Sequence, residues 1–255
     1  MSSISLTKKD KGRVLHIELN TPEKRNVLNG ESISRLIEAF QSLSEDLTVQ
    51  VVILSGKGPS FCAGGDLRWM LLPEGSADTE NFNSAGLLFN LFHTINRCPV
   101  PVIGKIHGAV YGGGIGLVSV CDVVVSHTEA EFCFSELKLS LIPSVISPFV
   151  LKKMPLHKAK LYMLSAQKFS AEEAEGLVHF TGSEEECEDY INSLTDRILQ
   201  FDRQAVKQAK DLLRKVAGQP IDQIKEYCVE ALARRRSSPD AIARMTRFLK
   251  AKDSK

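Results

Sequence analysis

Two glycine-rich turns and a later glutamate have the residue types needed for acid–base chemistry beside a carbonyl group. The turns are Ala63-Gly64-Gly65-Asp66 and Gly112-Gly113-Gly114, and the acid is Glu136. Backbone N–H groups at such turns can bind an oxygen on which negative charge develops, and each donor lowers a barrier by about 3–4 kcal/mol. A carboxylate with apolar neighbours tends towards a raised pKa, which suits a general acid or base. Taken alone, each turn could also be an ordinary connection, and Glu136 a solvent-facing acid at the start of a helix.

Each turn follows a run of apolar, β-branched residues that predicts a buried strand, over residues 49–56 and 100–110. A helix is expected after each turn, beginning near residues 66 and 113, so both turns would lie at helix N-termini with their partial positive charge. The second turn spaces its glycines as G-x-G-x-G, and the chain has no Gly-Lys-Ser or Gly-Lys-Thr sequence. A nicotinamide or ATP site is therefore not expected.

The rest of the chain alternates between short strands and amphipathic helices. Residues 4–19 alternate like a β-hairpin, and apolar spacing predicts a helix over residues 30–47. A polar break at residues 73–78 interrupts the next helical stretch and could be a lid over a pocket or a surface loop, while Trp69 and Met70 before it could face that pocket or the core. Further helices are expected over residues 158–176 (interrupted at 168–170, with Ser170 as a cap), 184–200, 204–216, 221–236 and 239–251.

Composition argues against several classes of partner and location. The 255 residues include 32 Lys and Arg against 31 Asp and Glu, so no global charge favours nucleic acid or an anionic membrane. The six cysteines form no C-x-x-C pair and are expected to be buried thiols in a reducing compartment. No secretory or transit pattern and no membrane-length apolar run are present, so a cytoplasmic location is expected. The triplet Arg234-Arg235-Arg236 could bind RNA, but a solvated or subunit-contact face is favoured.

Three segments resemble the enoyl-CoA hydratase/isomerase (crotonase) family: FCAGGDL (Phe61–Leu67), HGAVYGGGIGLVSVCDVVV (His107–Val125) and FCFSELKLSLIPSVISPFV (Phe132–Val150). The resemblance extends over nearly the whole chain. It implies an α/β crotonase-like spiral of ββα units over residues 1–195, followed by a helical oligomerisation region over residues 196–255. It also implies a homotrimer, or a hexamer made of two trimers.

The same resemblance assigns roles to the two turns and to Glu136. It implies an acyl-CoA thioester whose carbonyl oxygen binds the N–H groups of Gly65 and Gly113, with Glu136 as the catalytic acid or base. Coenzyme A then enters as part of the substrate, and no resident cofactor is expected. The residues that would border coenzyme A are Lys24, Arg25, Val27, Ala63, Gly65, Asp66 and Leu67, with Phe248 and Lys250 supplied by a neighbouring subunit. No metal site is expected, because the acidic run Glu184-Glu185-Glu186 has no histidine with it.

One position departs from the family pattern. Hydratases of the family have a first glutamate two residues after the glycine triplet, and here that position is Gly116. Double-bond isomerases of the family work with a single acid, so Gly116 favours isomerisation of a 3-enoyl-CoA to a 2-enoyl-CoA.

Residues 141–150 and 233–239, in contrast, are most like the methylglutaconyl-CoA hydratase-like branch. They favour hydration of an α,β-unsaturated acyl-CoA, such as a branched one of leucine or isoprenoid breakdown, and this is the leading hypothesis. Ser144 or Ser147 could help to place the water, or could simply cap the loop. A non-catalytic protein that binds acyl-CoA or RNA is the third hypothesis.

Overall fold

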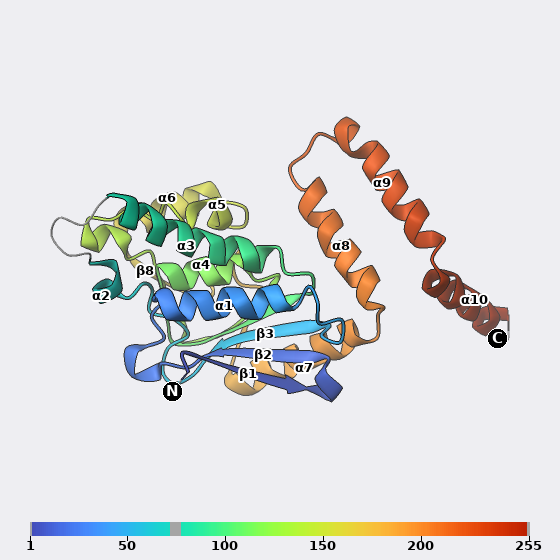
Figure 1. Ribbon diagram of the computed structural model, residues 1–255, viewed down its shortest axis with the longest axis horizontal. Helices are drawn as coiled ribbons and strands as arrows, with labels where there is room; N and C mark the ends of the chain where they lie inside the picture. The colour runs from blue at the N-terminus through green and yellow to red at the C-terminus, as the bar shows by residue number, and fades with distance from the viewer. Residues whose placement is uncertain (1, 72–77, 254–255) are drawn as a thin grey trace.

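The computed structural model describes residues 2–71 and 78–253, which form a core built on two sheets and an arm of helices (Figure 1). In the larger sheet β1 and β2 are antiparallel, and the other neighbouring strands are parallel. Its spatial order is β1 (Ile4–Lys9), β2 (Val14–Leu19), β3 (Val51–Gly56), β4 (Val102–Ile106), β6 (Val123–His127) and β9 (Phe180–Gly182). The smaller sheet contains β5 (Ala109–Tyr111), β7 (Glu131–Cys133) and β8 (Lys168–Ser170).

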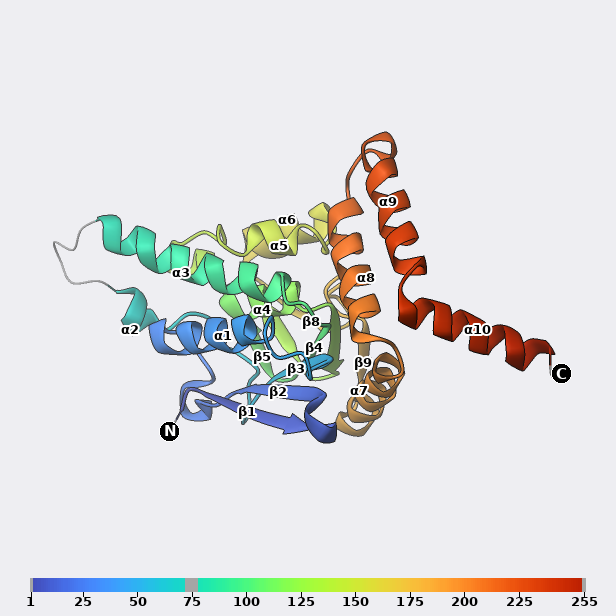
Figure 2. The same ribbon diagram turned by 45° about the vertical axis from the view of Figure 1, so that its right-hand side comes forward.

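Helices cover both faces of the larger sheet. One face carries α1 (Gly30–Ser42), α3 (Asp78–Asn96) and α4 (Gly113–Val120), and the other carries α7 (Glu184–Leu199) (Figures 1 and 2). The alternation of side chains along β2 produces this arrangement, because Leu15 and Ile17 join the main core while Val14 packs under α7. The remaining short helices are η1 (Asp10–Gly12), η2 (Pro22–Lys24), α2 (Leu67–Met70), η3 (Glu136–Leu139), α5 (Ser147–Val150) and α6 (Leu156–Ser165).

The prediction of a single strand over residues 100–110 is wrong, because this segment contributes one strand to each sheet. β4 belongs to the larger sheet and β5 to the smaller one. Gly108 lies between them with a φ of 56°, and a Cβ placed on it would lie 2.0 Å from the carbonyl oxygen of Pro59. Only glycine allows the chain to change direction at this point. The glycine turn at residues 112–114 therefore follows directly from a strand of the smaller sheet.

Two expected helices are shorter than predicted. α1 ends at Ser42, because the following residues form a turn in which Asp46 accepts a hydrogen bond from the Thr48 N–H at 3.0 Å. The stretch 158–176 is helical only as far as Ser165. β8 follows because residues 168–170 pair antiparallel with β7, and Phe169 stacks on Tyr162 with ring centroids 4.0 Å apart.

The expected cap at Ser170 is present, but it stabilises a turn and not the start of a helix. The Ser170 N–H donates to Glu173 Oε2 at 2.8 Å, and the Glu173 N–H donates to Ser170 Oγ at 3.2 Å. The β1–β2 hairpin and the helix that begins at Gly113 are confirmed. The predicted break at residues 73–78 lies almost entirely outside the described residues.

The C-terminal arm consists of α8 (Arg203–Val216), α9 (Ile221–Arg236) and α10 (Pro239–Asp253), and it projects away from the core (Figure 2). Polar contacts hold its first helix. Arg203 donates to the carbonyl oxygens of Val49 at 2.7 Å and Leu43 at 3.1 Å. Lys210 Nζ lies 2.6 Å from Asp122 Oδ2. The arm is therefore fixed at its base by directional hydrogen bonds.

The outer part of the arm leaves apolar side chains uncovered in the single chain. No described side chain of α9 or α10 is buried. The exposed apolar residues on these two helices include Ile221, Val229, Leu232, Ile242, Met245, Phe248 and Leu249. The proposed division of the chain between residues 195 and 196 falls within α7 and stays a prediction.

Candidate active site

The two glycine turns lie against each other. The segment around Cys62 runs beside β5, with the Cys62 N–H donating to Ala109 O at 3.2 Å and the Tyr111 N–H donating to Cys62 O at 3.0 Å. A Cβ placed on Gly113 would lie 3.9 Å from the Gly65 nitrogen. The structure thus brings together the two residues predicted to bind one carbonyl oxygen.

The N–H groups of Gly65 and Gly113 are both available to a ligand. Leu28 pairs with the residues on either side of Gly65, donating to Gly64 O and accepting from the Asp66 N–H, each at 2.8 Å. The Gly65 N–H therefore points away from Leu28, and Gly113 is the first residue of α4, where no helical carbonyl can accept its N–H. Among the described residues, no group accepts a hydrogen bond from either amide. All of α4 is buried, so the positive end of its dipole acts in a poorly screened environment.

Glu136 directs its carboxyl group at the same place. A Cβ on Gly112, the residue before α4, would lie 3.3 Å from Glu136 Oε1. Gly112 has a φ of 44° and a ψ of −111°, which other residues rarely adopt. Glu136 Oε2 is buried, and none of the described residues hydrogen-bonds to it. Burial raises the pKa of Glu136, opposed by a hydrogen bond from its own backbone amide, and this suits a group that takes up and returns a proton.

Apolar residues flank Glu136 in the sequence. Phe132 and Phe134 before it are buried in the core, while the exposed residues that follow are Leu137, Leu139, Leu141 and Ile142. Met70 Sδ would lie 2.7 Å from a Cβ on Gly65, whereas the Trp69 ring packs on Gly30, 3.0 Å from a Cβ placed there. Of the two α2 residues whose direction the sequence left open, Met70 therefore faces the site.

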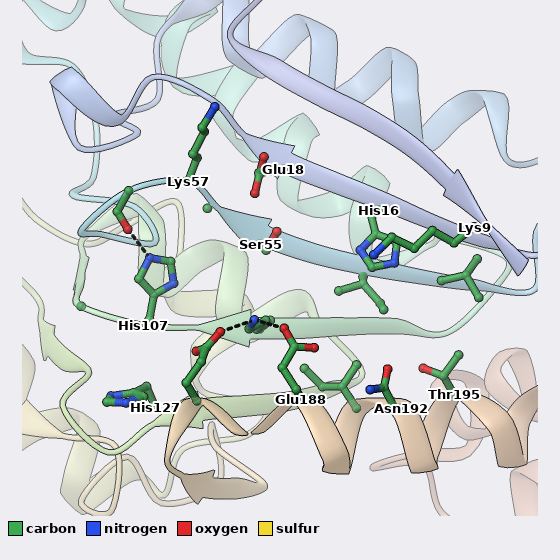
Figure 3. Close-up of a pocket in the computed structure, with 18 of the residues that line it drawn as sticks. Lys9, His16, Glu18, Ser55, Lys57, His107, His127, Glu188, Asn192 and Thr195 are labelled. Carbon is green, nitrogen blue, oxygen red and sulfur yellow. Dashed lines mark hydrogen bonds and ion pairs between the residues drawn. The ribbon is translucent and has the colours of Figure 1, made fainter. Parts of the chain in front are cut away.

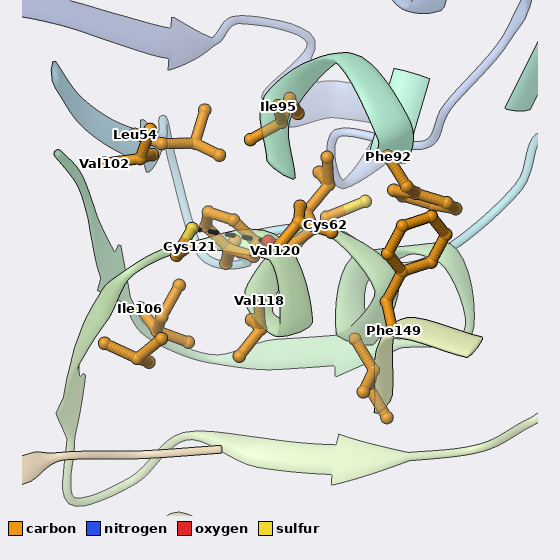
Figure 4. Close-up of a cluster of buried hydrophobic side chains, with 14 of the residues drawn as sticks. Leu54, Cys62, Phe92, Ile95, Val102, Ile106, Val118, Val120, Cys121 and Phe149 are labelled. Atoms are coloured by element: carbon orange, nitrogen blue, oxygen red, sulfur yellow. Dashed lines mark hydrogen bonds between the residues drawn. The ribbon is translucent and has the colours of Figure 1, made fainter. Parts of the chain in front are cut away.

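The position of the family's first glutamate is filled by core side chains. A Cβ on Gly116 would lie 2.5 Å from Phe92 Cζ and 2.7 Å from Ile146 Cγ2. Phe92 is fully buried and meets Phe149 edge to face, with ring centroids 5.9 Å apart (Figure 4). No second carboxylate can extend from residue 116 without displacing Phe92 and Ile146.

The loop predicted to border coenzyme A lies beside the first glycine turn. The Ala63 N–H donates to Arg25 O at 3.0 Å, and the side chains of Lys24 and Arg25 are exposed. Val27 is half-buried, and so is Asp66, whose side chain accepts the Arg68 N–H at 2.9 Å and begins α2, where Leu67 is exposed.

Phe248 and Lys250 are not brought to this place. Both lie on α10, at the far end of the arm from α4 (Figures 1 and 2). Phe248 and Lys250 could therefore contact only coenzyme A that is bound to another copy of the chain.

Asn26 is a residue of this loop that the sequence analysis missed. Its buried side chain accepts the Thr21 N–H at 2.9 Å and donates to Lys57 O at 2.9 Å and to Ser60 O at 2.8 Å. Its φ is 55°, a conformation that asparagine tolerates better than most residues. The only signal in the sequence was an asparagine in a turn.

Other candidate groups near the site are accounted for. Burial raises the pKa of the Cys62 thiol to about 12, so Cys62 is not a nucleophile at neutral pH. Ser147 Oγ donates to Pro143 O at 2.6 Å and caps the loop, whereas Ser144 is exposed.

The described part of the chain contains no group of three metal-ligating side chains. None of the described helices is long and apolar enough to cross a membrane.

A cavity of about 900 Å³ lies on the opposite face of the larger sheet and does not include Glu136. There, His16, Glu18 and Ser55 on the strands face Glu188, Asn192 and Thr195 on α7 (Figure 3). Lys105 in its floor pairs with both Glu184 and Glu188. The cavity is separated from the glycine turns by the sheet itself.

Comparisons with known proteins agree with this geometry. A family model described as enoyl-CoA hydratase/isomerase matches residues 9–252. A putative enoyl-CoA hydratase of Thermus thermophilus is 28% identical over 215 residues, which are 84% of this chain and 85% of that protein. The mitochondrial Delta(3,5)-Delta(2,4)-dienoyl-CoA isomerase of Mus musculus is 38% identical over 183 residues, which are 68% of this chain and 55% of the isomerase.

Solved structures share the fold. The crystal structure of an enoyl-CoA hydratase from Shewanella pealeana matches with a TM-score of 0.91 at 28% identity, over 98% of this chain and 94% of that one. Proteins named as hydratases and as isomerases thus occur among the relatives. Because the family model covers nearly the whole chain and the structural match covers both sheets and the arm, this protein belongs to the enoyl-CoA hydratase/isomerase family and has the crotonase fold.

Proposed function

We propose that this protein hydrates an α,β-unsaturated acyl-CoA thioester, with Glu136 as its acid–base group. The observation that carries this proposal is the position of the Glu136 carboxyl group over Gly112, beside the free N–H groups of Gly65 and Gly113. The thioester oxygen accepts hydrogen bonds from those two amides. Charge that develops on this oxygen is then stabilised without rearrangement of the protein.

One carboxylate suffices for both proton transfers of the addition. Glu136 takes a proton from water while the water oxygen bonds to the β-carbon, and the electrons of the double bond move into an enolate held at the two amides. The resulting carboxylic acid then gives the proton to the α-carbon. The raised pKa of Glu136 supports the first proton transfer, because burial makes its carboxylate a stronger base.

Coenzyme A is proposed to bind as part of the substrate, along the loop of Lys24, Arg25 and Val27. The exposed cations of this loop lie beside the Ala63–Leu67 turn, at a suitable place for phosphates. No resident cofactor is needed for the proposed steps. The likeness of residues 141–150 to the methylglutaconyl-CoA hydratase-like branch makes a branched enoyl-CoA the first substrate to test.

The working assembly is proposed to be a homotrimer or a hexamer of two trimers. The apolar residues of α9 and α10 support this, since Leu232 is 66% and Phe248 72% exposed in the single chain. Such an arrangement would allow Phe248 and Lys250 to reach the coenzyme A of a neighbouring copy. Arg234 and Arg235, by contrast, pair with Glu230 and Asp202 of the same chain, which weakens the case for RNA.

Double-bond isomerisation is the second candidate, and the packing at Gly116 favours it. With Phe92 and Ile146 in that place, Glu136 has no carboxylate partner from α4 to share the activation of water. Moving one proton from the α-carbon of a 3-enoyl-CoA to its γ-carbon needs only one base. The isomerase among the relatives also supports this alternative.

The two candidates are distinguished by incubating the protein with 2-enoyl-, 3-enoyl- and 3-methylglutaconyl-CoA in oxygen-18 water, followed by mass analysis. Incorporation of the label into the acyl chain is the expected result. Double-bond migration without label would replace hydration by isomerisation. Binding of all three thioesters without conversion would contradict both and favour a binding protein.

A further inference from the structure

Two oxygen atoms from adjacent residues lie over Gly112. A Cβ placed on Gly112 would lie 3.3 Å from Glu136 Oε1 and 3.5 Å from Ser135 Oγ. Both oxygens can approach the backbone here because Gly112 has no side chain. The Ser135 hydroxyl and the Glu136 carboxylate therefore both lie against Gly112, the residue before the free Gly113 amide.

The Ser135 hydroxyl has no other structural task among the described residues. Ser135 precedes η3, but its side chain makes no capping hydrogen bond to that helix. No described residue donates to or accepts from its Oγ, whereas Ser147 nearby is engaged with Pro143 O. A half-buried hydroxyl without a partner is available to bind a small polar molecule.

Water that adds to a double bond has to be held by more than one group. A single hydrogen bond to Glu136 would leave the water free to rotate, and its lone pair would not be directed at the β-carbon. The position that carries the additional glutamate in family hydratases is closed by Phe92 and Ile146. The second contact therefore has to come from another residue, and Ser135 Oγ lies over Gly112 with Glu136 Oε1.

We propose that Ser135 is this positioning residue for the nucleophilic water, an inference that rests on the proposed hydration. The water donates one O–H to Glu136 Oε1, which takes that proton, and the other to Ser135 Oγ. Its free lone pair is thereby turned towards the β-carbon of the thioester. Ser135 exchanges no proton in this step, so the balance of the addition is unchanged.

The test compares two reactions that use the same two amides and Glu136 but differ in whether a bound water molecule takes part. Hydration of a 2-enoyl-CoA requires bound water, whereas exchange of the α-proton of a saturated acyl-CoA in deuterium oxide requires only the two amides and Glu136. Ser135→Ala is expected to lower the hydration rate about tenfold and to change the exchange rate less than about twofold. Ser135→Thr, which keeps the hydroxyl, is expected to retain most of the hydration.

Each other outcome has a definite meaning. Unchanged hydration in Ser135→Ala, or an equal loss of hydration and exchange, would overturn the role of Ser135 while leaving the proposed function standing. A selective loss of hydration in Ser144→Ala instead would assign the water to the exposed loop. Wild-type protein that exchanges the α-proton but never hydrates would overturn the proposed function, and the role of Ser135 with it.

Discussion

Phe92 occupies the space into which a side chain at residue 116 would extend. Its Cζ atom lies 2.5 Å from the position of a Cβ on Gly116, and the ring is fully buried against Phe149 of α5. The missing glutamate therefore leaves no empty pocket behind it. Core side chains fill this position, so the proposed chemistry depends on Glu136.

Gly116→Glu is accordingly expected to destabilise the protein and not to supply a second acid. Overpacking of a core typically costs about 1–3 kcal/mol, and the burial of a carboxylate adds to this. Urea denaturation and the hydration rate of the variant test this expectation. Gly116→Ala provides the matched comparison, and its loss of stability should shrink in a Phe92→Leu background, where the ring no longer meets the new methyl group. A stable Gly116→Glu variant with faster hydration would contradict the packing argument.

Glu136→Gln removes the proton-transferring group but keeps its shape. The turnover of the active thioester is expected to fall about 10²- to 10⁴-fold, with little change in binding of a saturated acyl-CoA. Rates and calorimetric affinities measured on the same preparations give both values. Glu129→Gln, at an exposed carboxylate away from the glycine turns, is the control. Equal turnover in both variants would remove Glu136 from the mechanism.

The raised pKa of Glu136 predicts a specific pH dependence of activity. The carboxylate must be ionised to accept a proton, so kcat/KM is expected to rise with pH through a limb that lies above the usual range of a glutamate. A profile recorded from about pH 4 to about pH 8 covers this range. A limb at the position of an ordinary glutamate would mean that burial does not control this group in solution.

The raised pKa of Glu136 also makes the stability of the protein depend on pH, in the opposite direction from its activity. Between the pKa of unfolded Glu136 and its raised pKa in the folded protein, the native state binds more protons than the unfolded state, so the free energy of unfolding falls as the pH rises. Glu136→Gln lacks this dependence. Its stability relative to wild type should therefore increase with pH across that window and be constant below it, as measured by urea denaturation at several pH values.

The apolar face of α10 predicts that one charge can separate the subunits. Phe248→Glu is expected to lower the mass in solution to that of a single chain while the core stays folded, because a charged side chain cannot be buried in an apolar contact without a partner. Light scattering after size-exclusion chromatography measures the mass, and circular dichroism checks the fold. Ala243→Glu places the same charge on the other side of α10, and the mass of this variant should equal that of the wild-type protein. An unchanged mass in Phe248→Glu would exclude this face from the assembly.

The contact at the base of the arm can be compared with an exposed ion pair on the same helix. Lys210→Ala removes the amine that bonds Asp122 Oδ2 and Val100 O, and it should cost about 1–3 kcal/mol. Lys207→Ala breaks the more exposed pair with Asp211 on α8 and should cost no more than about 0.5 kcal/mol. Urea denaturation of the two variants measures the difference, and equal costs would mean that α8 is not anchored through Asp122.

The two glycine turns could be predicted from the sequence because each depends on a local pattern of strand, turn and helix. The repeat of this pattern allowed two N–H groups to meet at one oxygen, and the resemblance to a family identified them as those of Gly65 and Gly113. The contacts that distinguish this chain could not be predicted, since they join distant residues. Phe92 and Gly116 are 24 positions apart, and nothing in the local sequence around Gly116 shows which ring fills its place.

The change of sheet at Gly108 was missed for a similar reason. Residues 100–110 have the apolar composition of one continuous strand, and the reason for the break lies in the carbonyl oxygen of Pro59. Ser135 was visible only as the residue before Glu136. Its importance depends on the position of its hydroxyl over Gly112, beside the Glu136 carboxylate, which a sequence does not reveal.

The pairing of β5 with β7 sets the separation of the amide and carboxyl groups. Val110 pairs with Phe132 and Tyr111 with Cys133, and the Gly112 N–H donates to Cys133 O at 3.0 Å. Residues inserted between β6 and β7 at Thr128 and Glu129, which are exposed, leave this register unchanged, so the chain can lengthen there without loss of the site. A single deletion between Tyr111 and Gly113, or between Cys133 and Glu136, would instead shift one catalytic group against the other by about 3.3 Å. Differences in length among functional relatives should therefore collect in that connection and be absent from those two short segments.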